Sequence, residues 1–275
     1  MTFPFENGVA VITGAGSGIG RALALALAER QCDLALADRN EEALHETALR
    51  ARQRGVTVSE HVFDVADRDA IAALPDAVIA AHGRASLLFN NAGVALAGTF
   101  EQIELSDFEW LFEINFWGPV RLTKAFLPIL RREPAAHIVN ISSLFGLIAP
   151  AGQTAYAASK FAVRGFSEAL RHELEGSNVG LSVVHPGGVR TSIASSARIP
   201  PNVAPTIDPA QRARMEKLLS MPPERAAAII LAGVEKRAPR ILVGADAKRG
   251  DLLQRLRPAK YWATMQKRLQ RELER

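Results

Sequence analysis

The sequence predicts an α/β fold, a doubly wound parallel sheet of about seven strands with helices on both of its faces. Short β-rich runs alternate with longer helical segments through most of the chain, and most of these runs are continuously apolar. Continuous apolar runs are typical of parallel strands that are covered on both faces. The chain has 275 residues, of which 48% are hydrophobic, and no linker divides it, so we expect one domain.

The strands and helices are expected to alternate along the chain. The expected strands are 9–13, 34–38, 56–64, 86–90, 137–142, 180–185 and 240–244. The expected helices are 18–31, 40–54, 67–82, 105–132, 153–176 and 222–238. In the fourth helix, Ser106 and Glu109 have the spacing of a capping box. Pro119, which follows Gly118, predicts a break or a kink in the same helix.

A glycine-rich turn, "TGAGSGIG", directly follows the first expected strand. Gly14, Gly18 and Gly20 have the spacing G-x-x-x-G-x-G, and the sequence then becomes helical. Backbone N–H groups of such a turn and the N-terminus of the next helix favour a bound pyrophosphate. Small residues also form ordinary strand-to-helix turns, so the motif alone leaves that alternative open.

The next three strand ends also carry polar or small residues. Asp38 ends the second strand, Asp64 ends the third, and "NNAG" follows the fourth. A carboxylate at the position of Asp38 can accept hydrogen bonds from both ribose hydroxyls of an adenosine. It would also repel a 2′-phosphate, so NAD is expected in preference to NADP. Arg39 leaves NADP open, because its guanidinium could bind that phosphate if Asp38 turned away.

Ser142 and Ser143 close the fifth strand, and "YAASK" follows them. Tyr156 and Lys160 are four residues apart, so a helix places them on one face. An ammonium about 5 Å from the phenol is expected to lower the pKa of Tyr156 by about two units, which suits proton transfer. In the structural alternative, Tyr156 packs against the sheet and Lys160 is a solvated surface residue.

Taken together, "TGAGSGIG", "NNAG", Asn115 in "EINFWG", "SS", "YAASK" and "PGGVRT" resemble the short-chain dehydrogenase/reductase family of NAD(P)-dependent enzymes. The resemblance covers residues 9 to 191 and continues more weakly to Gly244. It implies that Tyr156 exchanges a proton with the substrate oxygen, and that Ser143 hydrogen-bonds this oxygen. It also implies that Lys160 holds the nicotinamide ribose and acidifies Tyr156, and that Asn115 holds a water of the proton relay. Ser142 is expected to have a structural role.

The same resemblance implies the residues that contact the cofactor. The Val189 backbone is expected to contact the carboxamide of the nicotinamide, and the Thr191 hydroxyl is expected to reach the nicotinamide side of the cofactor. The whole expected set is Gly14, Ser17, Gly18, Ile19, Gly20, Asp38, Arg39, Asp64, Val65, Asn91, Ala92, Gly93, Tyr156, Lys160, Pro186, Gly187, Val189 and Thr191.

The expected activity is NAD(P)-dependent interconversion of a secondary alcohol and a ketone, or of a primary alcohol and an aldehyde, on a small, partly apolar substrate. Two alternatives stay open, an NADP-dependent carbonyl reductase and a nucleotide-binding regulatory protein without turnover. A homo-oligomer is expected by family analogy.

The expected organisation is a Rossmann-type catalytic domain over residues 1–247 and a basic extension over 248–275. The segment 192–222 has no expected strand and is the expected substrate lid. The extension holds nine Lys/Arg against three Asp/Glu, and Tyr261, Met265, Leu269 and Leu273 recur in it every four residues. This pattern predicts an amphipathic helix, which we expect to pack on the body or on a neighbouring subunit. Contact with an anionic membrane surface is the less favoured alternative.

Other classes of function are not indicated. The single cysteine, Cys32, excludes an internal disulfide, and the six histidines are scattered, so no metal site is expected. Basic residues are not interleaved with aromatic ones along a groove, so no nucleic-acid partner is expected. The start of the sequence lacks a basic segment before its first apolar strand, and we expect a cytoplasmic protein. At least three of the five aromatic residues Phe108, Trp110, Phe112, Phe116 and Trp117 are expected in the core.

Overall fold

The structure, a computed structural model, describes residues 3–201, 203–204 and 219–266. Within them, seven parallel strands form one sheet with the order β3-β2-β1-β4-β5-β6-β7. The strands are β1 (Val9–Thr13), β2 (Asp33–Asp38), β3 (Val58–Val62), β4 (Leu87–Asn90), β5 (Ala136–Ile141), β6 (Val179–Pro186) and β7 (Arg240–Val243). The expected fold class is confirmed, and the strand order reverses between β1 and β4, where ligands bind in sheets of this kind.

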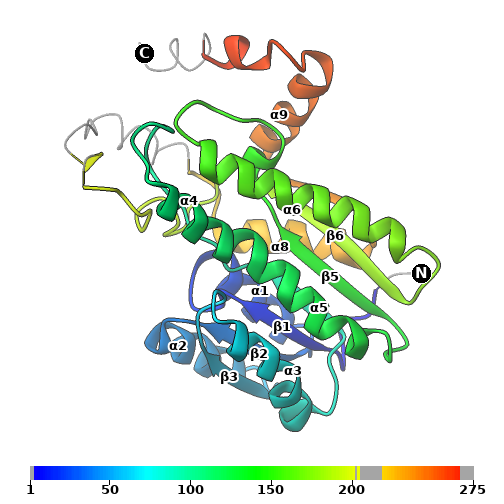
Figure 1. The fold of residues 1–275 in the computed structure, drawn as a ribbon. Helices are drawn as coiled ribbons and strands as arrows, with labels where there is room; N and C mark the ends of the chain where they lie inside the picture. The colour runs from blue at the N-terminus through cyan, green and yellow to red at the C-terminus, as the bar shows by residue number, and fades with distance from the viewer. Residues whose placement is uncertain (1–2, 202, 205–218, 267–275) are drawn as a thin grey trace.

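Helices cover both faces of the sheet (Figure 1). The described helical elements are α1 (Gly18–Ala28), α2 (Glu41–Arg52), α3 (Arg68–His82), α4 (Leu105–Phe112), the π-helical turn η1 (Glu113–Trp117), α5 (Gly118–Leu130), the 3₁₀ turn η2 (Leu144–Gly146), α6 (Thr154–Glu173), α8 (Pro223–Glu235) and α9 (Ala245–Leu256).

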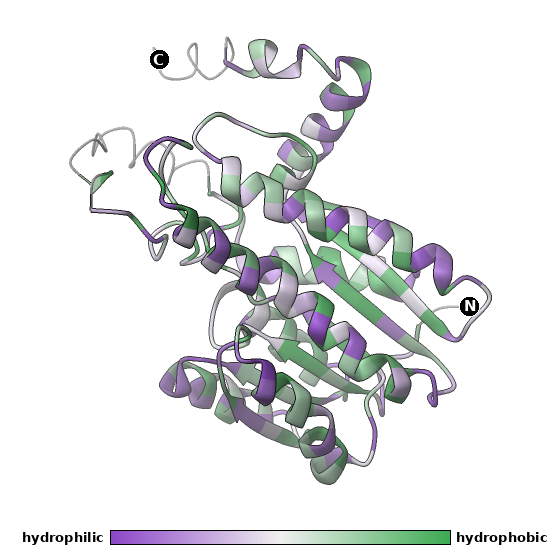
Figure 2. Ribbon diagram, viewed as in Figure 1, coloured by the Kyte–Doolittle hydropathy of each residue, from purple (hydrophilic) through white to green (hydrophobic). Residues whose placement is uncertain are grey.

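The core has two layers because successive strand residues point to opposite faces. In β1, Ala10 and Ile12 pack with α1, α2 and α8, whereas Val9 and Val11 pack with α3 and α5. Figure 2 shows that β1 is mostly hydrophobic, whereas the helices carry both polar and apolar residues. The sheet is therefore a rigid support, and its strand ends can hold polar side chains in fixed positions.

The start of the fourth expected helix differs from the prediction. Helix α4 begins at Leu105 with Glu104 as its N-cap, and the amide of Asp107 donates to the Glu104 carbonyl. Ser106 lies inside the first turn and is exposed, so the expected capping box is wrong. Asp107, in the first turn, is buried and lies 3.0 Å from the Arg198 guanidinium.

The expected break in the same helix is present. The π-helical turn η1 separates α4 from α5, and Pro119 is the second residue of α5. The backbone stays helical through this turn, and the Gly118 amide donates to the Glu113 carbonyl, so the π-helical turn is where the helix accommodates Pro119, which has no N–H.

Three of the five aromatic residues pack on the core, as expected, although none is fully buried. Phe108, Trp110 and Phe112 lie against the buried cluster of Leu96, Leu111 and Ala155, whereas Trp117 is 43% exposed. Phe108 and Phe112 stack on each other with ring centroids 5.3 Å apart, and Phe112 and Phe116 meet edge to face at 6.2 Å.

The C-terminal part of the described chain packs on the body. Helix α9 spans Ala245–Leu256, so the boundary expected at residue 247 falls inside a helix. Beyond it, the Tyr261 hydroxyl accepts a hydrogen bond from the Ala149 amide at 2.9 Å. The expected helical positions Leu269 and Leu273 lie outside the described residues. No helix of the described ranges is both long and apolar enough to cross a bilayer.

Candidate active site

The glycine turn between β1 and α1 is tightly packed. Gly14 and Gly18 have positive φ angles of 65° and 51°, a backbone conformation that glycine adopts without strain. A Cβ on Gly20 would overlap the carbonyl oxygen of Gly14. Ser17 and Ile19 lie between these glycines, Ser17 exposed and Ile19 half-buried. The turn can therefore present its backbone closely to a ligand.

Two side chains that the sequence analysis missed hold this turn. The Arg21 guanidinium donates to the Gly16 carbonyl and pairs with Glu46 at 2.8 Å. The Thr13 hydroxyl accepts from the amides of Asn91 and Ala92, both at 3.1 Å. Arg21 directly follows Gly20, and Thr13 is the polar end of an apolar strand, so both were visible as candidates in the sequence.

Asn91 joins the fourth strand end to the glycine turn. Its side-chain nitrogen donates to the carbonyls of Thr13 at 2.9 Å and Gly14 at 3.1 Å. Gly93, two residues further, lies between the two halves of the site. A Cβ on it would lie 3.2 Å from Oδ1 of Asn115 and 3.4 Å from Nζ of Lys160.

Asp38 is fixed at the end of β2. Its Oδ2 accepts from the Gly16 amide at 2.8 Å, and its Oδ1 accepts from the Asn40 amide at 3.0 Å. Arg39 points away into solvent, with 60% of its side chain exposed, and its guanidinium lies 3.9 Å from the Asp64 carboxylate. Val65 is buried. Asp38 therefore lies at the glycine turn, whereas Arg39 and Asp64 form a separate surface pair.

Ser143, Tyr156 and Lys160 meet where β5 and α6 approach each other. Helix α6 places Tyr156 and Lys160 one turn apart, and the Ser143 hydroxyl lies close enough to the Tyr156 phenol to oppose the rise of its pKa. The Lys160 ammonium is buried, donates to the Ile141 carbonyl at 3.1 Å, and lies 5.7 Å from the centroid of the Tyr156 ring. The structural alternative of a solvated Lys160 is therefore wrong.

The electrostatics of this group differ from the expectation. Burial raises the pKa of Tyr156, and the nearby Ser143 hydroxyl only partly opposes this. Burial lowers the pKa of Lys160 to about 8. The expected two-unit lowering of the Tyr156 pKa by Lys160 is wrong for this structure, because the ammonium is directed at the Ile141 carbonyl and desolvation of the phenolate dominates.

Asn115 is the central residue of η1, and its side chain is buried. Its Oδ1 accepts from the Val94 amide at 2.8 Å, and its Nδ2 donates to the Val94 carbonyl at 3.0 Å and to Ser159 at 3.2 Å. The amide thus joins the loop after β4 to helix α6. The expected structural role of Ser142 agrees with its hydrogen bond to the Lys160 carbonyl at 2.8 Å.

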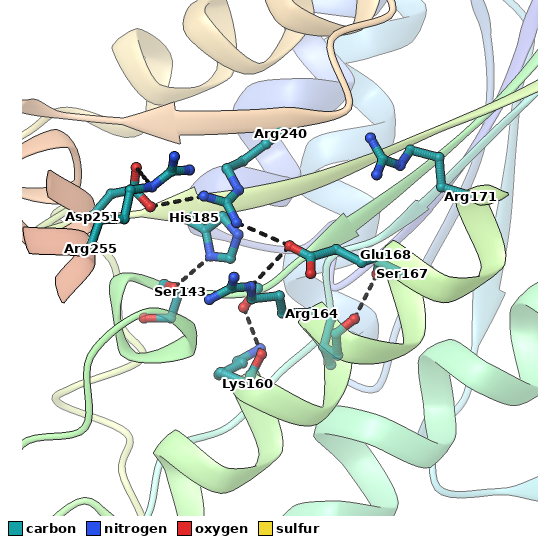
Figure 3. A network of polar contacts seen from close by, with 12 residues as sticks. Ser143, Lys160, Arg164, Ser167, Glu168, Arg171, His185, Arg240, Asp251 and Arg255 are labelled. Atoms are coloured by element: carbon teal, nitrogen blue, oxygen red, sulfur yellow. Dashed lines mark hydrogen bonds and ion pairs between the residues drawn. The ribbon is translucent and has the colours of Figure 1, made fainter. Parts of the chain in front are cut away.

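His185 supports Ser143 from β6 and was not singled out in the sequence analysis. Its Nδ1 lies 2.9 Å from the Ser143 carbonyl oxygen (Figure 3). Burial lowers the pKa of His185 to about 4, so the ring is neutral near pH 7 and Nδ1–H donates. A polar residue at a strand end was the available signal, but only the fold shows that β6 lies beside β5.

The segment after β6 crosses toward the glycine turn. Pro186 ends the strand, and the Gly187 amide donates to the Val243 carbonyl at 2.9 Å. Val189 is buried and pairs with Met221. A Cβ on Gly18 would lie 2.9 Å from Cγ2 of Thr191. The contacts therefore bring the glycine turn beside Asp38, Asn91 and Thr191, and bring Gly93 beside Asn115 and Lys160.

The described part of the expected lid is attached at both ends. Arg198 pairs with Leu96 in a short bridge, and its guanidinium lies 3.0 Å from Asp107 and stacks over the Trp110 ring at 4.8 Å. At the other end, the Arg190 amide donates to the Met221 carbonyl at 2.8 Å. Residues 202 and 205–218 of the expected lid lie outside the described residues.

The described chain shows no group of three or more His, Cys, Asp and Glu side chains that could hold a metal ion. Comparison with known protein families shows what the chain is similar to. The family model described as short chain dehydrogenase matches residues 8–201.

One relative is a protein of Mycobacterium tuberculosis named as an oxidoreductase, SadH, which is 46% identical over 261 residues, or 94% of this chain and 93% of the relative. Two solved structures have the same fold. A short chain dehydrogenase/reductase from Burkholderia phymatum, solved in complex with NAD, has a TM-score of 0.85 at 33% identity and covers 93% of this chain and 95% of its own. A short-chain dehydrogenase from Streptomyces avermitilis has a TM-score of 0.79 at 31% identity, with 96% and 97% covered.

Proposed function

Because this chain belongs to the short-chain dehydrogenase/reductase family and is an oxidoreductase of that family, we propose that it interconverts a secondary alcohol and a ketone with NAD as its cofactor. Interconversion of a primary alcohol and an aldehyde at the same site belongs to the same proposal. The observation that carries it is the group of Ser143, Tyr156 and Lys160 beside the glycine turn, joined to that turn through the loop that contains Gly93.

The residues at the strand ends fit a dinucleotide. The turn from Gly14 to Gly20 is so closely packed that a Cβ would fill it, and helix α1 begins at Gly18 with its free N–H groups. A pyrophosphate fits such a helix N-terminus. Asp38 would hold the adenosine ribose. Thr191 and the Val189 backbone would contact the nicotinamide, and Lys160 would hold the nicotinamide ribose. When bound, the nicotinamide supplies or accepts a hydride.

The geometry at Asp38 supports NAD over NADP. Two backbone amides hold its carboxylate, so it is not free to turn away and let Arg39 bind a 2′-phosphate. The repulsion between a carboxylate and a phosphate about 4 Å away is several kcal/mol at an effective dielectric constant of about 20. The NADP-dependent alternative would require Arg39 to exchange its Asp64 contact for the phosphate.

The acid–base chemistry belongs to Tyr156. Its raised pKa keeps the phenol protonated near neutral pH, so it donates a proton to the carbonyl oxygen during reduction and takes one back during oxidation. Ser143 hydrogen-bonds the substrate oxygen, and His185 fixes the backbone of Ser143 through its carbonyl. The buried Lys160 lies 5.7 Å from the centroid of the Tyr156 ring, where its ammonium would hold the nicotinamide ribose beside the phenol.

The segment 192–222 closes the substrate side in this proposal, and its apolar residues favour a partly apolar substrate. Arg198 fixes the first part of the segment to α4 through Asp107. We also propose a homo-oligomer, which sedimentation velocity would detect as a species larger than one 29.7 kDa chain.

Turnover tests the proposal. A panel of apolar secondary alcohols with NAD and of ketones with NADH should reveal a substrate for the wild-type chain. Tyr156→Phe should then lose at least about a hundredfold in kcat, because the phenol is the proton donor, while NADH binding stays within about twofold. Binding of NADH without turnover of any panel member would favour the regulatory alternative. Unchanged kcat in Tyr156→Phe would refute the assigned role.

A further inference from the structure

Helix α9 lies beyond the residues that match the family, which end at 201, yet it contacts the candidate site. Figure 1 shows it at the same end of the molecule as the N-terminal part of α6. A Cβ on Gly250 would overlap the Leu144 side chain, so α9 lies directly on the turn that follows Ser143. The helix is therefore close to both the proton-transfer residues and the segment after β6.

Asp246, in the first turn of α9, holds the segment after β6. Its Oδ2 accepts a hydrogen bond from the Gly188 amide at 2.6 Å. Both of its carboxylate oxygens lie so close to Gly187 that a Cβ there would overlap them. A carboxylate thus packs on the backbone of this turn, and glycine is the residue that permits the contact.

The turn at Gly187 and Gly188 determines where the following residues lie. Three residues after Gly188, Thr191 contacts the glycine turn of α1. Met221 holds the other side of this segment through the Val189 bridge and the Arg190 amide, so Asp246 and Met221 together fix the backbone that leads to Thr191. The contact with Asp246 therefore bears on the part of the site proposed to receive the nicotinamide.

Helix α9 is itself fixed relative to α6. The Asp251 carboxylate lies 2.9 Å from the Arg240 guanidinium, which also lies 3.0 Å from Glu168 of α6 (Figure 3). Glu168 also pairs with Arg164 of the same helix at 3.0 Å. Because Tyr156 and Lys160 are on α6, this chain of ion pairs ties the element that bears Asp246 to the element that bears the proton-transfer residues.

We propose that Asp246 is a positioning residue of the cofactor site, which holds the 187–189 backbone in the conformation that accepts the nicotinamide half of the dinucleotide. This inference rests on the proposed function. It goes beyond it by assigning a role in cofactor binding to the C-terminal helix.

A purely structural role predicts a different result. The Asp246 Oδ1 also accepts from the amide of Ala247 in its own helix, so the side chain could act only on the start of α9. Loss of such an interaction would lower the stability of the fold, and it would not weaken binding of the nicotinamide half more than binding of the adenosine half. The test must therefore compare a ligand that has the nicotinamide with one that lacks it.

The experiment is calorimetric titration of the full chain with NADH and with ADP-ribose, which lacks the nicotinamide. In Asp246→Ala, the Kd for NADH should rise about tenfold, and the Kd for ADP-ribose should stay within about twofold. Asp246→Asn keeps an acceptor oxygen and should raise the Kd for NADH by about threefold. It also tests the proposal if Asp246→Ala does not fold.

The matched control is Asp69→Ala, which removes an exposed carboxylate from the first turn of a different helix, α3. It should change the free energy of unfolding by no more than about 0.5 kcal/mol and leave both Kd values within about twofold. Equal weakening of both ligands in Asp246→Ala, or an unchanged Kd for NADH in both Asp246 variants, would overturn the inference and leave the proposed function intact. Wild-type protein that binds neither ligand would overturn both.

Discussion

The buried imidazole of His185 hydrogen-bonds the backbone of Ser143, with Nδ1 at 2.9 Å from the carbonyl oxygen. The other ring nitrogen, Nε2, has no hydrogen-bond partner among the described residues. Burial lowers the pKa of His185 to about 4. The neutral ring with its proton on Nδ1 therefore holds Ser143, and protonation of Nε2 would place an unpaired charge in the interior.

This pair predicts a loss of stability in mild acid. Burial also lowers the pKa of His137, to about 3, whereas an unfolded histidine titrates near 6.5. The unfolded chain therefore binds more protons than the folded one below about pH 6.5. The stability from the neutral rings is complete above that pH, and it decreases by up to about 1.4 kcal/mol per pH unit for each histidine as the pH falls toward 4.

Urea unfolding at pH 7.0 and 5.5 measures this effect. The decrease in the free energy of unfolding between these pH values should become smaller by about 1 kcal/mol in His185→Gln. The exposed His172 provides the control variant His172→Gln, which should keep the wild-type pH dependence. An unchanged pH dependence in His185→Gln would mean that His185 is not held neutral.

We predict that Lys160 lowers the stability of the fold while it supports activity. Burial lowers the pKa of this ammonium to about 8, so keeping it charged in the interior at pH 7 costs free energy. Lys160→Met should raise the free energy of unfolding at pH 7 by about 1 to 2 kcal/mol and reduce turnover by at least about a hundredfold. Chemical denaturation and steady-state kinetics measure the two effects.

The control for Lys160→Met is Lys124→Met, on the exposed side of α5. This variant should change the free energy of unfolding by no more than about 0.5 kcal/mol and leave turnover unchanged. A less stable Lys160→Met protein would show that the bond to the Ile141 carbonyl outweighs the cost of burying the amine.

The glycine turn predicts that alanine at two glycines of similar backbone conformation will affect NADH binding differently. Gly18 has a φ of 51° and Gly83 a φ of 73°, so alanine at either should cost roughly 1 kcal/mol of stability. A Cβ meets Thr191 at Gly18 but has no atom within 4 Å at Gly83. Gly18→Ala should thus weaken NADH binding about tenfold or more, and Gly83→Ala should leave it unchanged. Equal NADH affinity in the two variants would show that the turn does not hold the cofactor.

Asp38 predicts the cofactor preference. Asp38→Asn keeps an oxygen that can accept from the Gly16 amide and removes the negative charge. The ratio of the Kd for NADPH to the Kd for NADH should fall by about tenfold or more, because the repulsion of the 2′-phosphate is lost. Competitive titrations of wild type, Asp38→Asn and the surface variant Asp76→Asn measure this ratio. If all three ratios agree, Asp38 does not select the cofactor.

Local sequence patterns were sufficient for much of the fold. Each expected strand is present, because continuous apolar runs such as "VAVIT" have few alternatives to a buried strand. The spacing of Tyr156 and Lys160 was enough to place both on one side of α6, since helix geometry fixes that relation.

Contacts between distant segments were not accessible in this way. Asp246 lies 58 residues from its partner Gly188, and His185 lies 42 residues from Ser143. Both contacts exist because β5, β6 and β7 are neighbours in the sheet, which a single sequence does not specify. The expected pKa of Tyr156 failed for a related reason, because it assumed the direction of the Lys160 ammonium and neglected burial of the phenol.

Titration of the purified full-length chain with NADH and with NADPH tests the central claim most directly, with binding followed by calorimetry. The account predicts saturable one-site binding of NADH and weaker binding of NADPH, because the glycine turn receives the pyrophosphate and Asp38 rejects the extra phosphate. Binding of neither dinucleotide would contradict the account, since the glycine turn would then be only a connection between β1 and α1.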